Sequence, residues 1–594
     1  MKLLLSWAAV SLLLAGSSEA ASSGGVAFWS MDAMHRVGRS DLPADDDAPH
    51  VEAARGEWES FQVIATGSPT ALVGAQVTAG GAESLGSGKA LPVPVVLREE
   101  YVRVTTSTPR SPLPPGDYAD ALVPQSFPAG PLPSDERVNV PFWVDVFVPY
   151  GSEPGEYRGT VELRLVRGEV LAMEYRVTVW GVDLPVVPSL RTSIALSWRR
   201  VAELHGFDRD ADYPTENLQA LLNAYTDLLA QHRLSVNELR GTYPDAKTGI
   251  LDVEKAEKEL RRHLLHQHAS TISLPLGPDW PFADPLGRDR RAAQRYAAEW
   301  MKLLDRFRCA GRGYVIMMNL DEPNDAEAYG VVREWGAFFN EVEKQYGVRM
   351  PLLVTEQPTP DDPSWGKLDG AADIWVPHFS SVYEDMEASS GRRDIARRIA
   401  AGDEVWAYAA LVQMSEAWEA TNQRPKILKE AHPPVWCTDY PPMNFRIVPW
   451  LLMRHGITGL AYWDVVHFER GNDPWLDAGS FRGVDGSTFN GDGFFIYPAT
   501  KYRQGANQPV ASIRLKWLRD SMEDYDYLTL LADAKGRAAA LAVSAGFADG
   551  FGSWSDNPTA LYAARREIAT LLSEPKEQIL PAVRTETPKP SQAP

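Results

Sequence analysis

The first part of the chain, from residue 24 to residue 186, shows short apolar runs separated by Gly- and Pro-containing turns. Residues 61–65 and 142–148 are such runs, and residues 160–165 alternate apolar and polar side chains with a period of two. This period is typical of strands with one buried face. Because almost no helical pattern intervenes, we predict a β-sandwich accessory domain over residues 24–186.

The pattern changes after a proline-containing linker at residues 184–188, where apolar runs begin to alternate with amphipathic helical stretches such as 215–232, 289–307 and 325–346. Eight strand-then-helix units favour a (β/α)8 TIM barrel over residues 190–535. An open doubly wound sheet is the alternative, but its usual Gly-rich phosphate loop is missing. The eight apolar runs are residues 191–197, 234–238, 270–276, 314–320, 350–355, 372–377, 404–410 and 457–463.

The end of the chain is predicted to be helical and then disordered. Residues 514–534 read as an amphipathic helix, and another helix is expected near residues 559–573 within a C-terminal helical extension at 536–574. The proline-containing tail at residues 575–594 is predicted to be disordered. One face of the first helix carries Leu515, Leu518, Met522 and Tyr525.

The start of the chain is typical of a secretory signal peptide. Lys2 supplies the positive charge, residues 3–14 are largely apolar, and Ser18-Glu19-Ala20 is a suitable cleavage site. No Cys occupies a lipoprotein box, and no later apolar run is long enough to span a bilayer. We therefore predict removal of residues 1–20 and a secreted or periplasmic protein with no membrane partner.

Composition narrows the possible partners. The formal net charge of −20 repels phosphate backbones, so the sequence argues against nucleic-acid binding. Nineteen Trp residues are compatible with sugar-binding clefts and with large cores alike. Cys309 and Cys437 are too few for a disulfide framework or a Cys-rich zinc site, and we expect two free thiols.

The strongest catalytic candidates follow the fourth predicted barrel strand. Asp321 and Glu322 are adjacent and are followed by Pro323. Reacting groups in such barrels lie at the carboxyl ends of strands, and crowded carboxylates suit general acid catalysis. A solvated acidic turn is the alternative interpretation.

The other strand ends offer few acids. Glu356 follows the fifth strand and Asp464 the eighth, whereas the seventh, residues 405–410, offers none. Retaining barrel glycosidases commonly pair an acid on strand four with a carboxylate nucleophile on strand seven. A glycosidase with this sequence therefore needs a nucleophile from elsewhere.

Aromatic and polar residues gather at the same predicted rim. Sugar rings stack on aromatic faces, and sugar hydroxyls need polar partners. Each of these residues, taken singly, is as readily explained by core packing. The candidate substrate-binding residues are Trp198, His378, Tyr383, Tyr408, Trp463 and Asp464.

Several of these segments are similar to one known family. The chain resembles glycoside hydrolase family 123, in which a catalytic barrel follows an N-terminal β-sandwich. The segments that carry the resemblance are 320–323, 457–463, 491–498, 512–519 and 523–528, together with 55–62 and 142–145.

The resemblance implies β-N-acetylgalactosaminidase-type chemistry, in which the 2-acetamido oxygen of the substrate attacks its own anomeric carbon to give an oxazoline. Asp321 and Glu322 match the adjacent Asp and Glu of the family. Asp321 would orient the acetamido N–H, and Glu322 would be the general acid and base. A Tyr usually holds the acetamido oxygen, with Tyr408 the first candidate and Tyr383 the second. Substrate assistance also agrees with the missing strand-seven carboxylate.

The sequence therefore predicts a secreted hydrolase of a carbohydrate substrate that needs no metal or other cofactor. Two alternatives stay open. The chain is either a hydrolase of another glycan that pairs Glu322 with Glu356 or Asp464, or a glycan-binding surface protein without catalysis.

Overall fold

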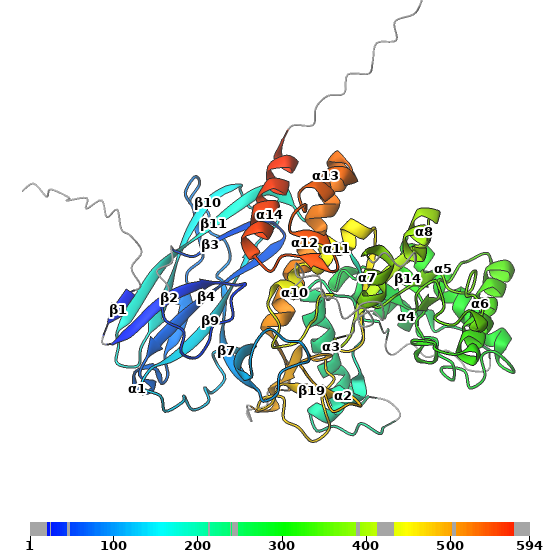
Figure 1. Cartoon of the computed structure of the whole chain (residues 1–594), viewed down its shortest axis with the longest axis horizontal. Coiled ribbons are helices and arrows are strands. Elements are labelled where there is room, and N and C mark those ends of the chain that lie inside the picture. The colour runs from blue at the N-terminus through cyan, green and yellow to red at the C-terminus, as the bar shows by residue number, and fades with distance from the viewer. Residues whose placement is uncertain are drawn as a thin grey trace, which may run out of the picture.

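The structure is a computed structural model that describes residues 21–574, except residues 24, 44–47, 212–213, 238, 240–247, 388–392, 413–432 and 502–506. The predicted signal peptide and C-terminal tail lie outside the described residues. Figure 1 shows a mixed α/β chain, with the sheets of the first part (blue to cyan) on one side and the helices of the second part (green) on the other.

The first part contains two sheets that share one hydrophobic core. The first sheet has the order β1-β2-β4-β9-β7-β8 and the second β3-β11-β10-β5, with β6 beside β10. Phe61 and Phe142 from the first sheet meet Tyr157 and Tyr175 from the second. The bounds are β1 Ala21–Ser23, β2 Val26–Asp32, β3 His50–Arg55, β4 Glu57–Gly67, β5 Gln76–Ala79, β6 Glu83–Ser84, β7 Val95–Val104, β8 Gly116–Pro124, β9 Val138–Val148, β10 Gly155–Arg164 and β11 Val170–Asp183, with the short helix α1 Pro69–Leu72.

Strand β9 shows why these residues form a sheet covered on both sides. Its side chains are nearly all buried, in keeping with an almost continuous apolar sequence. Phe142 and Val144 face the second sheet, whereas Trp143 belongs to the core of the second part of the chain. The first sheet is therefore packed between two hydrophobic cores.

The second part is built around parallel strands in the order β12-β18-β17-β16-β15, with the parallel pair β13-β14 apart from them. Isolated parallel bridges join Ile194 to Val236 and Val315 to Leu352. All eight predicted apolar runs contribute a strand or a bridge, but the hydrogen-bonded sheet is five-stranded, and the closed eight-stranded barrel stays a prediction. The bounds are β12 Arg191–Ile194, β13 Ile272–Ser273, β14 Gly313–Tyr314, β15 Leu353–Val354, β16 Ile374–Trp375, β17 Glu404–Ala409 and β18 Gly459–Tyr462.

Helices follow these strands and begin close to the predicted positions. The side chains of Thr215, Asp252 and Asp325 cap α3, α4 and α6 by accepting a backbone N–H from the first turn. The bounds are α2 Trp198–Leu204, α3 Glu216–Gln231, α4 Val253–Arg261, α5 Arg290–Arg306, α6 Ala326–Tyr346, α7 Phe379–Glu387, α8 Asp394–Ala401, α10 Met443–Arg446, α11 Val448–His455, α12 Ile513–Lys535, α13 Arg537–Ala542 and α14 Pro558–Ser573. None of the helices in the described ranges is long and apolar enough to cross a bilayer.

Small elements complete the connections between the helices and strands. Among the described residues, three antiparallel strand pairs lie in the last third of the chain. Their strands are β19 Gly479–Arg482 with β20 Thr488–Asn490, β21 Ile496–Pro498 with β22 Pro509–Ala511, and β23 Ala548–Gly550 with β24 Ser553–Trp554. The single-turn helices are Arg262–His266, Ala310–Arg312, Met318–Leu320, Pro363–Trp365 and Ala499–Lys501.

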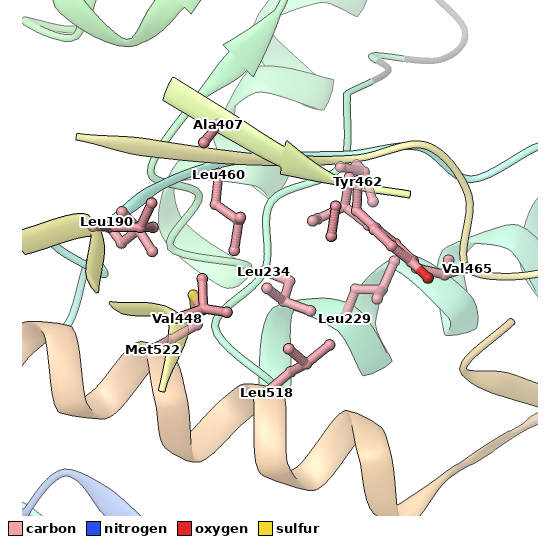
Figure 2. Close-up of a cluster of buried hydrophobic side chains, with 14 of the residues drawn as sticks. Leu190, Leu229, Leu234, Ala407, Val448, Leu460, Tyr462, Val465, Leu518 and Met522 are labelled. Atoms are coloured by element: carbon pink, nitrogen blue, oxygen red, sulfur yellow. The ribbon is translucent and has the colours of Figure 1, made fainter. Parts of the chain in front are cut away.

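Helix α12 packs its apolar face against the parallel sheet. Leu518 and Met522 point toward Leu234 and Val448, below the strand that carries Leu460 (Figure 2). This confirms the predicted helix and the face that carries Leu518 and Met522.

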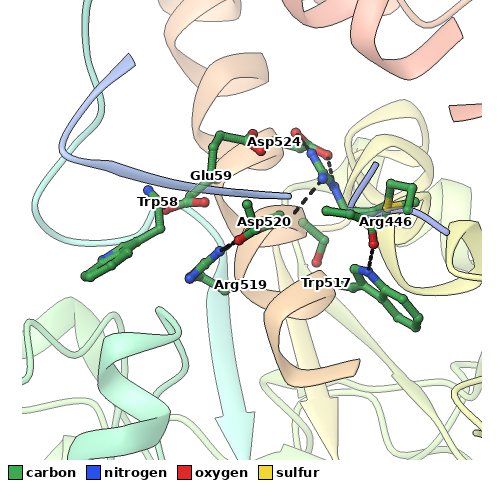
Figure 3. A network of polar contacts seen from close by, with 12 residues as sticks. Trp58, Glu59, Arg446, Trp517, Arg519, Asp520 and Asp524 are labelled. Atoms are coloured by element: carbon green, nitrogen blue, oxygen red, sulfur yellow. Dashed lines mark hydrogen bonds and ion pairs between the residues drawn. The ribbon is translucent and has the colours of Figure 1, made fainter. Parts of the chain in front are cut away.

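The opposite side of α12 differs from the amphipathic prediction, because its polar residues are buried as well. Arg519 pairs with Asp145 of β9. Arg519 also pairs with Asp520 of its own helix, and Arg446 of α10 pairs with Asp520 and Asp524 (Figure 3). The first sheet covers this side, so ion pairing takes the place of solvent. A sequence pattern alone does not distinguish such a buried polar face from an exposed one.

Candidate active site

One pocket lies at the carboxyl ends of the parallel strands and has a volume of about 260 Å³. Residues in or just after β12, β14, β15, β17 and β18 contribute to it, as expected for parallel strands that share one end. Its walls include Ala195, Asn237, Asp321, Glu322, Thr355, Tyr408, Leu411, Tyr462, Trp463 and Phe481.

The two adjacent acids lie exposed in this pocket and are joined by one hydroxyl. Thr355, just after β15, donates its Oγ1 hydrogen to Asp321 Oδ1 at 2.7 Å and accepts the backbone N–H of Glu322 at 2.8 Å. Glu322 has a φ of 44°, in the left-handed region that non-glycine residues rarely adopt. The bond from its N–H to Thr355 therefore supports a strained backbone next to the two carboxylates.

Tyr408 of β17 reaches the second acid, because its hydroxyl donates a hydrogen bond to Glu322 Oε1. Burial, and then the negative charge of Glu322, raises the pKa of Tyr408 well above its usual value. The phenol therefore keeps its proton and acts as a fixed donor to the carboxylate.

His378 lies behind Tyr408 and outside the pocket wall. The ring centroids of the two residues are 5.0 Å apart in an edge-to-face arrangement. His378 Nε2 donates to the carbonyl of Ala410 at 2.9 Å, and Nδ1 lies 2.8 Å from the hydroxyl of Ser380. Burial lowers the pKa of His378 to about 4, so the ring is neutral near pH 7 and orders the end of β17.

Aromatic residues line another part of the pocket wall. Trp463, just after β18, and Phe481 of β19 have ring centroids 6.0 Å apart at 79°, and His467 lies 4.7 Å from the Trp463 ring. The indole Nε1 of Trp463 donates to Asp492 Oδ2 at 3.2 Å. Burial raises the pKa of Asp492 to about 6, so its carboxyl is mostly ionised near neutral pH.

Besides His378, three further predicted substrate-binding residues do not line this pocket. Trp198 begins α2, and the ring of Tyr383 in α7 packs over Gly552. Asp464 is buried and pairs with Arg200 at 3.1 Å, and burial raises its pKa to about 6. Their part in substrate binding stays a prediction.

The sequence patterns missed several pocket residues. Asn237 and Thr355 are polar residues at or near the ends of predicted apolar strands, a signal that could have identified them. The pocket residue Phe481, and Asp492, which is buried behind the pocket, lie in the Gly- and Asp-rich segment 471–493, where no periodic pattern links a residue to the end of a strand.

Other reactive groups lie outside this pocket. Cys309 and Cys437 are free, buried thiols, as predicted. Among the residues that the structure describes, no group of three or more His, Cys, Asp or Glu side chains is arranged to hold a metal ion.

Comparison with known proteins supports one family. Residues 428–531 match the model of the glycoside hydrolase 123 catalytic domain, a span that includes Trp463 and Asp492 but neither Asp321 nor Glu322. The chain resembles glycoside hydrolase family 123. No curated protein sequence matches the chain.

Comparison with solved structures shows which known proteins share the fold of this chain. A family 123 glycoside hydrolase from Clostridium perfringens, studied for glycolipid glycan hydrolysis, matches with a TM-score of 0.62 and 12% identity over 92% of this chain and 98% of that chain. A family 39 glycoside hydrolase from Bacteroides cellulosilyticus reaches a TM-score of 0.33 at 10% identity, over 75% and 80% of the two chains. The second score is too low to carry an argument, whereas the first shows a fold shared with a family 123 enzyme. Together with the family match, it supports a glycosidase.

Proposed function

We propose that the protein is a secreted glycoside hydrolase that cleaves a β-linked 2-acetamido sugar, of the β-N-acetylgalactosaminidase type, with assistance from the substrate. The observation that carries the proposal is the pocket whose lining contains the adjacent acids Asp321 and Glu322 together with Trp463. The family 123 match and the lack of an acid in residues 405–410, at the carboxyl end of the predicted seventh strand, support the same chemistry.

The proposed reaction has two steps. In the first, the acetamido oxygen attacks the anomeric carbon while the glycosidic bond breaks, and Glu322 gives its proton to the leaving oxygen. Asp321 accepts the acetamido N–H and stabilises the positive charge that develops on the oxazoline. In the second, Glu322 takes a proton from water, which opens the oxazoline and restores the acid.

The surrounding residues suit these roles. The bond from Thr355 to Asp321 leaves the other carboxylate oxygen for the acetamido N–H. Trp463 offers a flat face to the apolar side of a sugar ring. Tyr408 bonds to Glu322 in this structure, and once Glu322 carries the acid proton its hydroxyl becomes available to the acetamido oxygen.

The test is hydrolysis of chromogenic aryl β-glycosides of N-acetylgalactosamine and N-acetylglucosamine. Wild type should release the aryl group, and Glu322→Gln and Asp321→Asn should each lose roughly a hundredfold or more in kcat. Glu327→Gln, an exposed acid in the first turn of α6, is the matched control and should keep full activity. No turnover by folded wild type on either substrate would refute the proposal.

A second candidate is a two-carboxylate hydrolase of another glycan, in which Glu356 partners Glu322. Burial raises the pKa of Glu356 to about 7, and the charge of Glu322 also contributes to the rise. This candidate predicts turnover of glycosides without a 2-acetamido group and loss of that turnover in Glu356→Gln. Substrate assistance predicts neither result.

We further propose that residues 1–20 are a cleaved signal peptide, that residues 24–186 form the β-sandwich and residues 190–535 the (β/α)8 catalytic domain, with the helical extension at 536–574. The shared core of the first two sheets supports the domain division. The intact mass of secreted protein tests the cleavage, and a retained Met1 would contradict it.

A further inference from the structure

The carboxylate of Asp492 lies behind the pocket and contacts three of its walls. Its Oδ2 accepts the indole N–H of Trp463 and the backbone N–H of Leu411, each at 3.2 Å. Its Oδ1 accepts the hydroxyl of Tyr462 at 3.2 Å. All three donors belong to pocket residues, whereas Asp492 itself is buried and does not line the pocket.

The backbone around Asp492 lets it approach this closely. Gly491 and Gly493 have φ values of 75° and 68°, which favour glycine. A Cβ on Gly493 would lie 2.4 Å from the Trp463 ring, so the indole packs directly on this backbone. The N–H of Gly493 also donates to the Tyr462 hydroxyl at 2.8 Å, which orients that hydroxyl toward Asp492.

Arg514 of α12 fixes the same loop from the other side. Its guanidinium donates to the carbonyls of Gly491 and Phe494 at 2.7 and 2.6 Å and pairs with Asp120 of β8 at 2.8 Å. Arg514 and Asp120 are both fully buried. The first sheet therefore holds the loop that places Asp492, which gives that sheet a part in shaping the pocket.

Leu411 is the second strained residue at the pocket. Its φ of 53° is in the left-handed region, and its N–H bonds to Asp492. Without this acceptor, the backbone at the end of β17 would lose the bond that supports the strained geometry.

We propose that Asp492 is a positioning residue of the active site, whose carboxylate fixes the Trp463 indole and the Leu411 backbone and so sets the width of the sugar pocket. It touches no reacting atom. The kinetic part of this inference rests on the proposed function, whereas the orientation of Trp463 does not.

The first test needs no activity. In protein labelled with 15N-tryptophan, the indole 15N–1H resonance of Trp463 is assigned by its loss in Trp463→Phe. Asp492→Asn replaces an ionised acceptor by a weaker one, and this resonance should shift or broaden. Asp526→Asn is the matched control, because Asp526 is an equally buried acid on α12 whose partners, Ser189 and Arg233, do not line the pocket. An unchanged Trp463 resonance in folded Asp492→Asn would overturn the proposal.

The second test separates substrate binding from chemistry. A displaced aromatic wall should raise KM for the aryl 2-acetamido glycosides by about fivefold or more in Asp492→Asn, with kcat changed less. Tyr462→Phe removes one donor to Asp492 while keeping the ring, and covers the case in which Asp492→Asn does not fold. It should shift the same resonance and raise KM less. If the Trp463 resonance shifts but KM stays unchanged, Asp492 does not set the width of the sugar pocket. If wild type shows no turnover, the proposed function is refuted, and the resonance test of Trp463 orientation stays valid.

Discussion

The hydroxyl of Tyr408 in β17 donates a hydrogen bond to the carboxylate of Glu322, in the segment that follows β14, and both residues line the pocket. Tyr408 is buried, whereas Glu322 is exposed at the pocket. A rigid donor thus holds the side chain to which we assign the proton transfers.

Removing this donor should slow the reaction. Tyr408→Phe keeps the ring and deletes the hydroxyl that bonds to Glu322 and, in the proposed reaction, to the acetamido oxygen as charge develops. One hydrogen bond to a charged group is worth about 1.5–3 kcal/mol, or roughly ten- to a hundredfold in kcat/KM. The kinetics of aryl 2-acetamido glycoside hydrolysis check this. Tyr175→Phe, in the second sheet, loses a hydroxyl far from the pocket and should keep wild-type kinetics. Equal rates for Tyr408→Phe and wild type would remove Tyr408 from the site.

Thr355 offers a test by rescue. Thr355→Val has nearly the same shape but cannot bond to Asp321 or accept the N–H of Glu322, so both acids lose their common support. We expect kcat to fall by about tenfold or more. Thr355→Ser restores the hydroxyl and should recover most of the activity. If Thr355→Val and Thr355→Ser are equally active, the Thr355 hydroxyl has no role in orienting Asp321 and Glu322.

A buried acid in the first sheet predicts a pH-dependent stability. Glu99 has 3% of its surface exposed, its carboxylate oxygens accept no hydrogen bond from the described residues, and burial raises its pKa from 4.5 to about 8. The folded state therefore binds a proton more tightly than the unfolded state. The stability from this proton is fully present below about pH 4.5 and is lost as the pH rises through about 8.

Glu99→Gln removes this titration. Relative to wild type, the variant should gain up to about 1.4 kcal/mol of unfolding free energy per pH unit between about pH 5 and pH 8. Urea unfolding of both proteins across this range measures the difference. A difference independent of pH would show that Glu99 ionises in the folded state as it does in water.

The ion pairs between the first sheet and α12 predict a large stability effect. Burial alone would raise the pKa of Asp145, but the charges of Arg519 and Lys516 outweigh it and lower the pKa. Asp145→Asn removes the carboxylate that pairs with Lys516 and leaves Arg519 paired with Asp520 alone, and this should cost about 3–5 kcal/mol. Thermal unfolding checks this, with Glu153→Gln at the exposed pair with Lys89 as a control that leaves the midpoint unchanged. An unshifted midpoint in Asp145→Asn would contradict this part of the account.

How much of the fold and the site could be predicted from the sequence depends on which interactions leave a periodic pattern along the chain. Helices α3, α5 and α6 end within about two residues of their predicted bounds, because caps and apolar spacing are local signals. Asp321, Glu322, Tyr408 and Trp463 could be identified as pocket residues because the carboxyl ends of parallel strands meet at one edge. Asp492 could not, since its partners are fixed by a loop that α12 and the first sheet hold in place. The pairing of Asp145 with Arg519 is equally invisible, because 374 residues separate them.

The central claim is that the substrate's acetamido oxygen is the nucleophile. A series of aryl 2-acetamido glycosides with successive fluorines on the acetyl methyl group measures this directly, because each fluorine weakens that oxygen while the leaving group stays the same. The account predicts a steep fall in kcat/KM, by roughly tenfold or more across the series. Equal rates for the unsubstituted and fully fluorinated substrates would contradict it.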